Sequence, residues 1–190
     1  DMLLASAYHP SFRLEKLGGK LYTDGGFVDS LPLHELVVNG YKDIIAVRIP
    51  GMGWERRFRM PEDVNVTTIH TNSDLGFVLN FGAAQSRRDM AIGYLEAQRV
   101  IYGLYGQKYY IDRSMTDREA LEWLLDHCAE EGENLRTVCE KELPRLARKL
   151  NAEDGDYYEL MAAKLEQECA NRDIDNMRVY TDRELIALVG

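Results

Sequence analysis

The sequence lacks several features that define whole classes of protein. No stretch approaches the roughly eighteen apolar residues of a membrane-spanning helix, and no basic segment followed by an apolar one suggests a signal peptide. Cysteine is scarce, and Cys128, Cys139 and Cys169 do not have the spacing of metal ligands. Three widely spaced cysteines on apolar helical faces favour buried free thiols over a disulfide framework. We therefore expect a reducing, cytoplasmic setting, with no metal and no other cofactor.

Familiar catalytic motifs are also absent. The sequence has no Gly-x-Ser-x-Gly nucleophile elbow, no phosphate-cradling glycine loop and no His-x-x-x-His pair. Every serine lacks flanking glycines, so none is a credible nucleophile: Ser6, Ser11, Ser30, Ser73, Ser86 and Ser114. The chain does not begin with methionine, and its first residues read as a helix entered midway. We therefore expect a piece of a longer protein.

What is present describes a globular protein with an uneven charge distribution. The 190 residues are 45% hydrophobic and 29% charged, enough for one domain with an appendage. Residues 1–111 carry 12 acidic and 12 basic side chains, whereas residues 112–190 carry 20 and 11. This shift predicts a boundary near Asp112, with an acidic, all-helical accessory subdomain after it. Its negative charge argues against nucleic acid binding by that part.

The first part has the pattern of an α/β protein. Lys20–Thr23 is expected as a short strand, Pro32 begins a helix that stops at Asn39-Gly40, and the apolar run Asp43–Ile49 predicts a strand buried on both faces of a parallel sheet. This order is a βαβ unit. Val64–His70 alternates apolar and polar residues and predicts another strand, with His70 in a structural role.

Helical patterns dominate the rest of the chain. A long helix is expected from Ala83 to Tyr105, with Gly93 packed closely against another backbone. One face of this helix is apolar and is formed by Met90, Tyr94, Ala97, Ile101 and Leu104, with Ala91, Leu95 and Val100 beside them. Two capping boxes, at Thr116 and Thr181, introduce helices, and further apolar stripes lie between them. These stripes favour core packing over a cofactor box or a partner groove.

Two stretches of the first part leave alternatives open. The loop from Pro50 to Pro61 interleaves aromatic and cationic residues that either contact lipid headgroups or simply face solvent: Trp54, Arg56, Arg57, Phe58 and Arg59. The run Tyr22–Leu33 places Asp24 before Gly25 and Gly26. Asp24 is either a turn former or a carboxylate presented at a strand end, where ligands of α/β sheets bind.

Several of these motifs occur together and in order. An Ala-Ser-Ala helix precedes Pro10, the Asp24-Gly25-Gly26 run follows, and then comes an Ile-Ile-Ala-Val strand. This set resembles the C-terminal part of the catalytic domain of bacterial patatin-like phospholipases. The resemblance covers roughly residues 3–110 and includes Asp74-Leu75-Gly76 ahead of the Gly93-Tyr94 helix. It implies a partial α/β/α layer of mostly parallel strands, followed by the helical subdomain.

The resemblance also implies a mechanism. Patatin-like enzymes hydrolyse lipid esters with a serine–aspartate dyad and no histidine, and the family's aspartate matches Asp24, supported by Gly25 and Gly26. The serine and the glycine-rich oxyanion segment lie upstream in the family and are absent from this sequence, so the chain alone is expected to be inactive. Asp29 is expected to be a cap or turn residue.

Two functions of different classes remain open. Either the chain is part of a lipid acyl hydrolase, cytoplasmic or peripheral at a membrane, or it is a non-catalytic scaffold. In the scaffold, the acidic helices bind a protein partner or gate access to lipid. A Gly-x-Ser-x-Gly upstream of Asp1 in the gene would favour the hydrolase. The sequence indicates neither the acyl-chain preference nor the oligomeric state.

Overall fold

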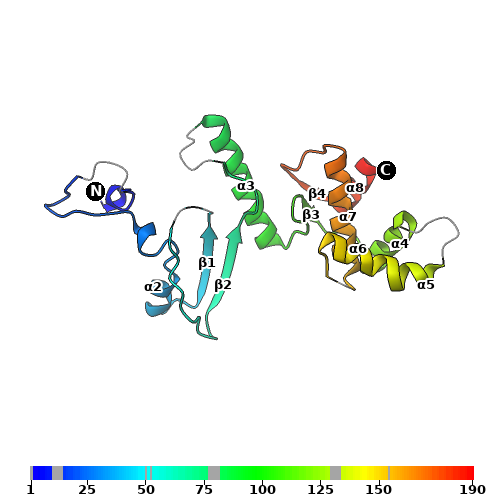
Figure 1. The fold of residues 1–190 in the computed structure, drawn as a ribbon, viewed down its shortest axis with the longest axis horizontal. Helices are drawn as coiled ribbons and strands as arrows, with labels where there is room; N and C mark the ends of the chain where they lie inside the picture. Colours follow the sequence, from blue (N-terminus) through cyan, green and yellow to red (C-terminus); the bar gives the residue numbers. More distant parts are fainter. Residues whose placement is uncertain are drawn as a thin grey trace. The chain divides into compact units, whose positions relative to one another are not determined.

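The computed structural model of the chain is shown in Figure 1 and describes residues 2–9, 15–49, 51, 53–76, 82–128, 134–153 and 155–190. Pro10, Ser11 and Pro50, which entered the expectations above, lie outside these residues. The protein is mixed α/β, and its described strands pair in parallel. Contacts divide it into two compact units, Asp1–Thr71 and Asn72–Gly190. The boundary expected from charge near Asp112 stays a prediction.

The first unit is built around a two-stranded parallel sheet. Its described elements are α1 (Met2–Ala5), the 3-10 turn η1 (Gly25–Phe27), α2 (Leu33–Val38), β1 (Asp43–Arg48) and β2 (Asn65–His70). Asp43 lies opposite Asn65, and Arg48 lies opposite His70. The helix after Pro32 and both of these strands are confirmed. Helix α2 stops where the sequence predicts, because Asn39 caps it and Gly40 follows with φ of +88°.

The strand expected at Lys20–Thr23 is wrong, and with it the βαβ unit. Among the described residues, Lys20 pairs only with Leu17, across a turn in which Gly18 and Gly19 have positive φ. Residues 21–24 form no strand with any described segment. An extended segment becomes a strand only when another one pairs with it, and β propensity does not reveal whether that partner exists.

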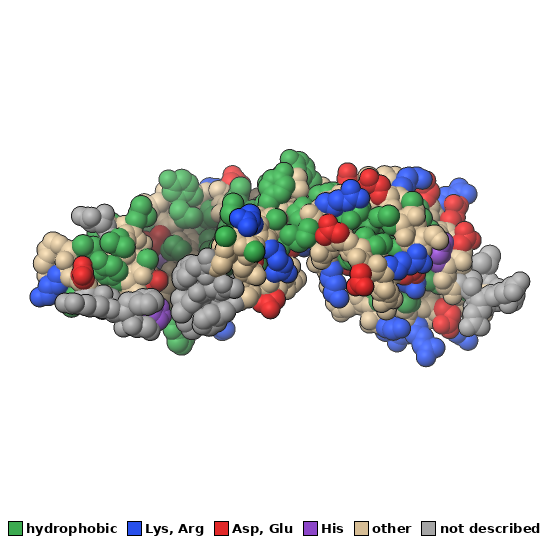
Figure 2. All heavy atoms as spheres, turned by 90° about the horizontal axis from the view of Figure 1, so that it is seen from above, with side chains coloured by type: hydrophobic (Ala, Val, Ile, Leu, Met, Phe, Trp, Pro, Cys, Tyr) green, Lys and Arg blue, Asp and Glu red, His purple; other side chains and the backbone are tan. Residues whose placement is uncertain are grey.

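Strand β1 is buried on one face only, which corrects the expectation of burial on both. Ile44 and Ala46 are 5% and 3% exposed, whereas Ile45 and Val47 are 70% and 60% exposed. Hydrophobic side chains reach the surface in several places in Figure 2. In the described part of the chain, the side chains on this face of β1 therefore stay exposed, although parallel sheets are normally covered on both faces.

We therefore expect the sheet of the isolated 190-residue chain to open easily. Amides of β1 and β2 should exchange with deuterium at least about 10³-fold faster than those in the middle of α7 (Tyr157–Asn171), whose core is complete. Hydrogen exchange followed by mass spectrometry measures both rates in one sample. Equal protection of the sheet and of α7 would contradict this expectation.

The second unit is mainly helical. Its elements are α3 (Ala83–Tyr102), β3 (Tyr110–Asp112), α4 (Asp117–Cys128), α5 (Leu135–Thr137), the π-helical turn η2 (Val138–Glu142), α6 (Leu143–Leu150), α7 (Tyr157–Asn171), β4 (Val179–Thr181) and α8 (Asp182–Val189). Residues from all the predicted apolar stripes after Thr116 meet in one core, including Leu124, Leu143, Leu165 and Leu185, each at most 2% exposed. Core packing of these stripes is therefore confirmed.

Both predicted capping boxes are present. The Thr181 hydroxyl accepts the Glu184 N–H at 3.2 Å, and the Glu184 carboxylate accepts the Thr181 N–H at 2.8 Å. Thr116 and Glu119 form the same reciprocal pair. The part after residue 112 is not all-helical, however, because β4 pairs with β3. Strands of three residues are too short to produce a recognisable alternation in the sequence.

Helix α3 buries only part of its predicted apolar face. Met90, Tyr94 and Ile101 are 74%, 66% and 65% exposed, and Ala97 and Leu104 are half-buried. Leu95, predicted beside this stripe, is buried together with Ile92 and Glu96. The Cβ position of Gly93 meets no atom within 4 Å, so the close packing expected there is also absent from the described residues. The sequence therefore carries an apolar face that the described part of the chain leaves partly uncovered.

Glu96 and Arg99 join α3 to the helical core instead. The Glu96 carboxylate accepts the Tyr110 hydroxyl at 3.1 Å and an Arg99 N–H at 2.6 Å. The Arg99 guanidinium also lies 4.3 Å from the Tyr110 ring centroid. Burial, followed by the nearby Glu96 charge, raises the pKa of Tyr110 to about 12, which keeps its hydroxyl a donor at neutral pH.

No described helix is both long and apolar enough to cross a membrane.

Candidate functional site

The Asp24 turn has a defined local geometry. Asp24 caps the 3-10 turn η1, and its carboxylate oxygen Oδ1 accepts the Gly26 N–H at 2.7 Å. The residue is half-buried. Within the described residues no donor reaches the second oxygen, Oδ2. The turn thus fixes the orientation of the carboxylate while leaving one oxygen available to another group.

One neighbour of this turn is the segment after α1. The Asp24 N–H donates to the Tyr8 carbonyl at 2.8 Å, and the Gly25 N–H donates to the Ser6 carbonyl at 3.3 Å. The rings of His9 and Phe27 lie 5.3 Å apart. Residues far apart in the sequence therefore hold the turn from one side, in the same region where the family resemblance begins.

The other neighbour is the loop that follows β1. The Trp54 N–H donates to the Gly26 carbonyl at 2.9 Å, and the Ser30 N–H donates to the Trp54 carbonyl at 2.7 Å. Asp29 accepts the N–H groups of Leu31 and Arg56 at 3.2 and 3.3 Å. Asp29 is thus a turn residue, as predicted, and it also fastens this loop.

Gly53 allows the two segments to approach each other. A Cβ at this position would lie 2.9 Å from the Ser30 Cβ and 3.2 Å from the Gly26 carbonyl oxygen. At Gly51 the nearest atom would be 4.0 Å away. We expect Gly53→Ala to push the loop from the turn and lower the thermal midpoint of the first unit by a few degrees, roughly the effect of 1 kcal/mol. Gly51→Ala is the matched control, and an equal shift from both variants would contradict this role.

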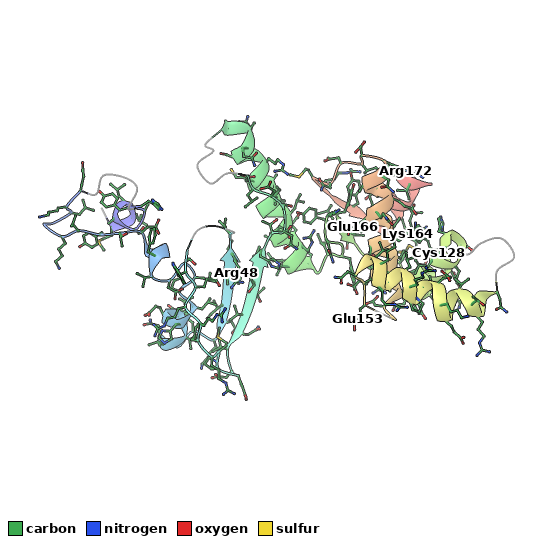
Figure 3. All side chains as sticks on the ribbon, viewed as in Figure 1. Arg48, Cys128, Glu153, Lys164, Glu166 and Arg172 are labelled. Atoms are coloured by element: carbon green, nitrogen blue, oxygen red, sulfur yellow. The ribbon has the colours of Figure 1, made fainter. Side chains whose placement is uncertain are left out.

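A pocket of about 340 Å³ lies beside these loops, at the carboxyl ends of β1 and β2. Its lining residues are Ser30, Arg48, Ile49, Gly51, Gly53, Glu55, His70 and Thr71. Figure 3 labels Arg48, whose guanidinium lies 2.8 Å from the Glu55 carboxylate. This is the edge of a parallel sheet at which ligands usually bind. The sequence predicted only a structural role for His70, and it did not identify Arg48 or Glu55 as residues of a site.

The residues predicted to contact lipid separate into two groups. Trp54, Arg56, Arg57 and Arg59 are exposed, and Trp54 is 74% exposed. Phe58 is half-buried, with its ring 5.4 Å from that of His34. In the described residues, no carboxylate lies within ion-pair distance of the three arginines. Four of the five side chains are therefore accessible at the surface of the described part of the chain.

One serine does donate a hydrogen bond to an aspartate, but far from Asp24 in the sequence. The Ser114 hydroxyl and the N–H groups of Ser114 and Met115 all donate to Asp182, as does the Tyr158 hydroxyl at 2.9 Å. Burial would raise the pKa of Asp182, but these hydrogen bonds outweigh it and lower the pKa. A carboxylate so fully engaged is a poor base, so this pair is structural.

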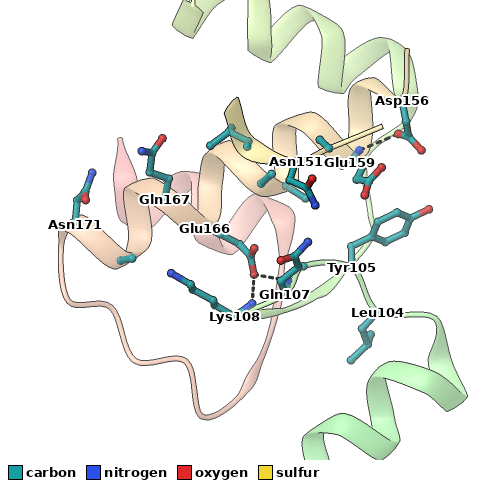
Figure 4. Close-up of a pocket in the computed structure, with 16 residues that line it drawn as sticks. Leu104, Tyr105, Gln107, Lys108, Asn151, Asp156, Glu159, Glu166, Gln167 and Asn171 are labelled. Carbon is teal, nitrogen blue, oxygen red and sulfur yellow. Dashed lines mark hydrogen bonds between the residues drawn. The ribbon is translucent and has the colours of Figure 1, made fainter. Parts of the chain in front are cut away.

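The helical unit has a cleft of about 650 Å³, shown in Figure 4. It lies between residues 104–108, residues 150–152 and α7. Glu166 is 8% exposed at its wall and accepts the N–H groups of Gln107, Lys108 and Tyr109 at 2.8, 2.7 and 2.6 Å. Nothing in the sequence singled out Glu166, since its partners are 57 to 59 residues away.

The cysteines and the other metal-binding side chains show no metal centre in the described part of the chain. There, no three histidine, cysteine, aspartate or glutamate side chains are grouped so that they could hold an ion. The three cysteines are free, and burial raises the pKa of Cys169 to about 11, as expected of an unreactive core thiol.

Comparisons of the chain with family models, curated proteins and solved structures found no match.

Proposed function

We propose that this chain is part of a patatin-like lipid acyl hydrolase and supplies Asp24, the base of its serine–aspartate dyad. The observation that carries the proposal is the state of the Asp24 carboxylate: Oδ1 is fixed by the Gly26 N–H at 2.7 Å, and Oδ2 has no donor among the described residues. The uncovered face of β1 also fits a partial α/β/α layer, because further strands and helices would cover it.

The reaction follows the chemistry of a serine esterase. The serine oxygen attacks the carbonyl carbon of a lipid ester while Asp24 accepts the hydroxyl proton. The alcohol then leaves with that proton, and an acyl-serine remains. Water attacks the acyl group, Asp24 accepts a proton from the water and returns one to the serine oxygen, and the fatty acid is released. Since the sequence has no nucleophile elbow, the serine belongs to another segment of polypeptide.

The proposal predicts that the 190-residue chain has no esterase activity by itself. We expect hydrolysis of a short-chain nitrophenyl ester at the rate of buffer alone, because one half of the dyad cannot activate a serine that is absent. A longer protein that contains an upstream Gly-x-Ser-x-Gly should hydrolyse the same ester. Turnover by the isolated chain that disappears in Asp24→Asn would contradict the proposal.

We further propose that the loop around Trp54 contacts the lipid surface. The chain has two tryptophans, and Trp123 is buried, so Trp123→Phe leaves Trp54 as the only tryptophan, which can be excited selectively above the tyrosine absorption. Addition of anionic vesicles should then shift its emission to shorter wavelengths, as aromatic rings do at a membrane interface. Replacing Arg56, Arg57 and Arg59 by glutamate should abolish the shift. An unchanged spectrum in the parent, or an undiminished shift in the triple variant, would remove this idea.

A second candidate is the non-catalytic scaffold, in which the helical unit binds a protein partner or gates access to lipid. The cleft of about 650 Å³ in that unit favours it, since three carboxylates line it: Asp156, Glu159 and Glu166. The scaffold predicts that Asp24→Asn is without effect on any activity of the complete protein. The hydrolase predicts a large loss.

A further inference from the structure

The pocket at the ends of β1 and β2 holds charges of both signs close together. The Arg48 and Glu55 side chains form an ion pair at 2.8 Å and remain 50% and 45% exposed. That contact uses one guanidinium nitrogen and one carboxylate oxygen. Among the described residues, no other hydrogen bond engages the remaining guanidinium N–H groups of Arg48 or the second carboxylate oxygen of Glu55. These groups can therefore bind a ligand.

Other donors lie on the cationic side of this pair. Arg48 lies directly opposite His70 in the parallel register, and residues paired in this way point to the same face of the sheet. The Ser30 side chain also lines the pocket. An anionic group beside Arg48 would therefore meet a guanidinium, an imidazole and a hydroxyl, while a cationic group a few ångströms away would meet Glu55.

We propose that this pocket binds the zwitterionic headgroup of a phosphatidylcholine or phosphatidylethanolamine, with the phosphate at Arg48 and His70 and the ammonium at Glu55. A zwitterion can lie antiparallel to the ion pair without separating it, whereas a purely anionic headgroup meets the Glu55 charge. The volume of about 340 Å³ lies at the small end of the range for ligand pockets, roughly 300–1,000 Å³. The identification of the ligand as a lipid headgroup rests on the proposed function.

Trp54 connects this pocket with the candidate base. It lies between Gly53 and Glu55, which both line the pocket, and its N–H donates to the Gly26 carbonyl at 2.9 Å. Gly26 in turn donates to Asp24. One short loop therefore carries the headgroup pocket, the exposed indole and the contact with the catalytic turn, so a bound headgroup would hold its ester bonds near that turn.

Titration of the isotope-labelled 190-residue chain with soluble phosphocholine and with inorganic phosphate tests the proposal by NMR. Phosphocholine should shift the pocket resonances saturably. Glu55→Gln should raise its dissociation constant about tenfold, as expected for the loss of one charged contact, while inorganic phosphate binds no more weakly. Arg48→Gln should weaken both ligands. The control is Asp63→Asn, which removes the exposed Lys42–Asp63 ion pair at the opposite end of the same two strands.

Sedimentation with vesicles identifies the source of the headgroup. All vesicles contain the same fraction of phosphatidylglycerol, so that attraction of the arginines near Trp54 contributes equally. The parent chain should bind more tightly when the remaining lipid is phosphatidylcholine than when it is an uncharged galactolipid, and Glu55→Gln should lose that preference. Binding of free phosphocholine without this preference would overturn the lipid assignment. The site itself is refuted by the absence of saturable phosphocholine binding, or by equal effects of Glu55→Gln and Asp63→Asn in chains with unchanged spectra elsewhere. Asp24→Asn should bind normally, so failure of the catalytic proposal would leave this result intact.

Discussion

Under the proposed function, Asp24→Asn in the complete protein is expected to lower kcat for lipid ester hydrolysis roughly 10³-fold, the usual contribution of a positioned general base. Asparagine keeps the shape of the side chain, and its amide oxygen can still accept the Gly26 N–H that Asp24 accepts at 2.7 Å. What it loses is the ability to take a proton from the serine. Initial rates of lipid ester hydrolysis, measured with sedimentation on vesicles, separate this loss from a loss of binding.

Asp29→Asn is the matched control for this experiment. Asp29 is also half-buried, lies in the same turn region and accepts two backbone N–H groups, at 3.2 and 3.3 Å. Because both of its contacts are structural, its substitution should change kcat by less than about tenfold, in line with a small shift in loop position. Equal losses in the two variants would show that Asp24 acts only through the fold.

Asp182→Ala is expected to destabilise the helical unit by about 3–5 kcal/mol, because it leaves several buried donors without an acceptor. Asp182 is 0% exposed and accepts N–H groups from Ser114 and Met115 and the hydroxyl of Tyr158. Urea unfolding followed by circular dichroism measures the change. Asp175→Ala provides the comparison. The Asp175 carboxylate accepts the Met177 N–H at 3.1 Å in an exposed position, and the backbone carbonyl that accepts the Tyr180 hydroxyl is kept in the variant, so this substitution should cost less than about 1 kcal/mol.

The same residue predicts the response of the helical unit to acid. The pKa of Asp182 is lowered in the folded protein, so the unfolded chain binds its proton more readily. Its contribution to stability is therefore complete above about pH 4 and is lost as the pH falls through the lower folded value. Asp182→Ala should unfold with less dependence on pH below about 4. An unchanged acid dependence would contradict this role.

The elements that could be predicted from the sequence are those whose signals are local. Helix α2 is fixed by Pro32 at its start and Asn39-Gly40 at its end, and α8 by the Thr181–Glu184 capping box. The predictions that were wrong concern features that depend on contacts between distant segments. Lys20–Thr23 has suitable residues for a strand, but among the described residues only Lys20 pairs, with Leu17. The outer face of β1 is apolar, but Ile45 and Val47 on it are exposed in the described part of the chain. Local propensity says nothing about whether a partner is present.

The same distinction applies to the candidate site, where the local turn could be predicted and the long-range contacts could not. The Asp24-Gly25-Gly26 turn follows from its residue types, and the structure gives it the capped geometry that such a turn should have. The contacts that hold it, from Tyr8 on one side and Trp54 on the other, depend on how distant segments meet. Glu166 and Asp182 were missed for the same reason, since their partners are mostly backbone N–H groups 57 to 68 residues away.

The proposed division of the dyad between Asp24 and a serine in another segment can be tested by covalent labelling. The complete protein would be treated with a fluorophosphonate, and the modified residue located by mass spectrometry. We expect the label on the serine of an upstream Gly-x-Ser-x-Gly, none on the serines of this chain, and roughly 10³-fold slower labelling in Asp24→Asn. Stoichiometric labelling of Ser6, Ser30 or Ser114, or an undiminished rate in Asp24→Asn, would contradict the proposal.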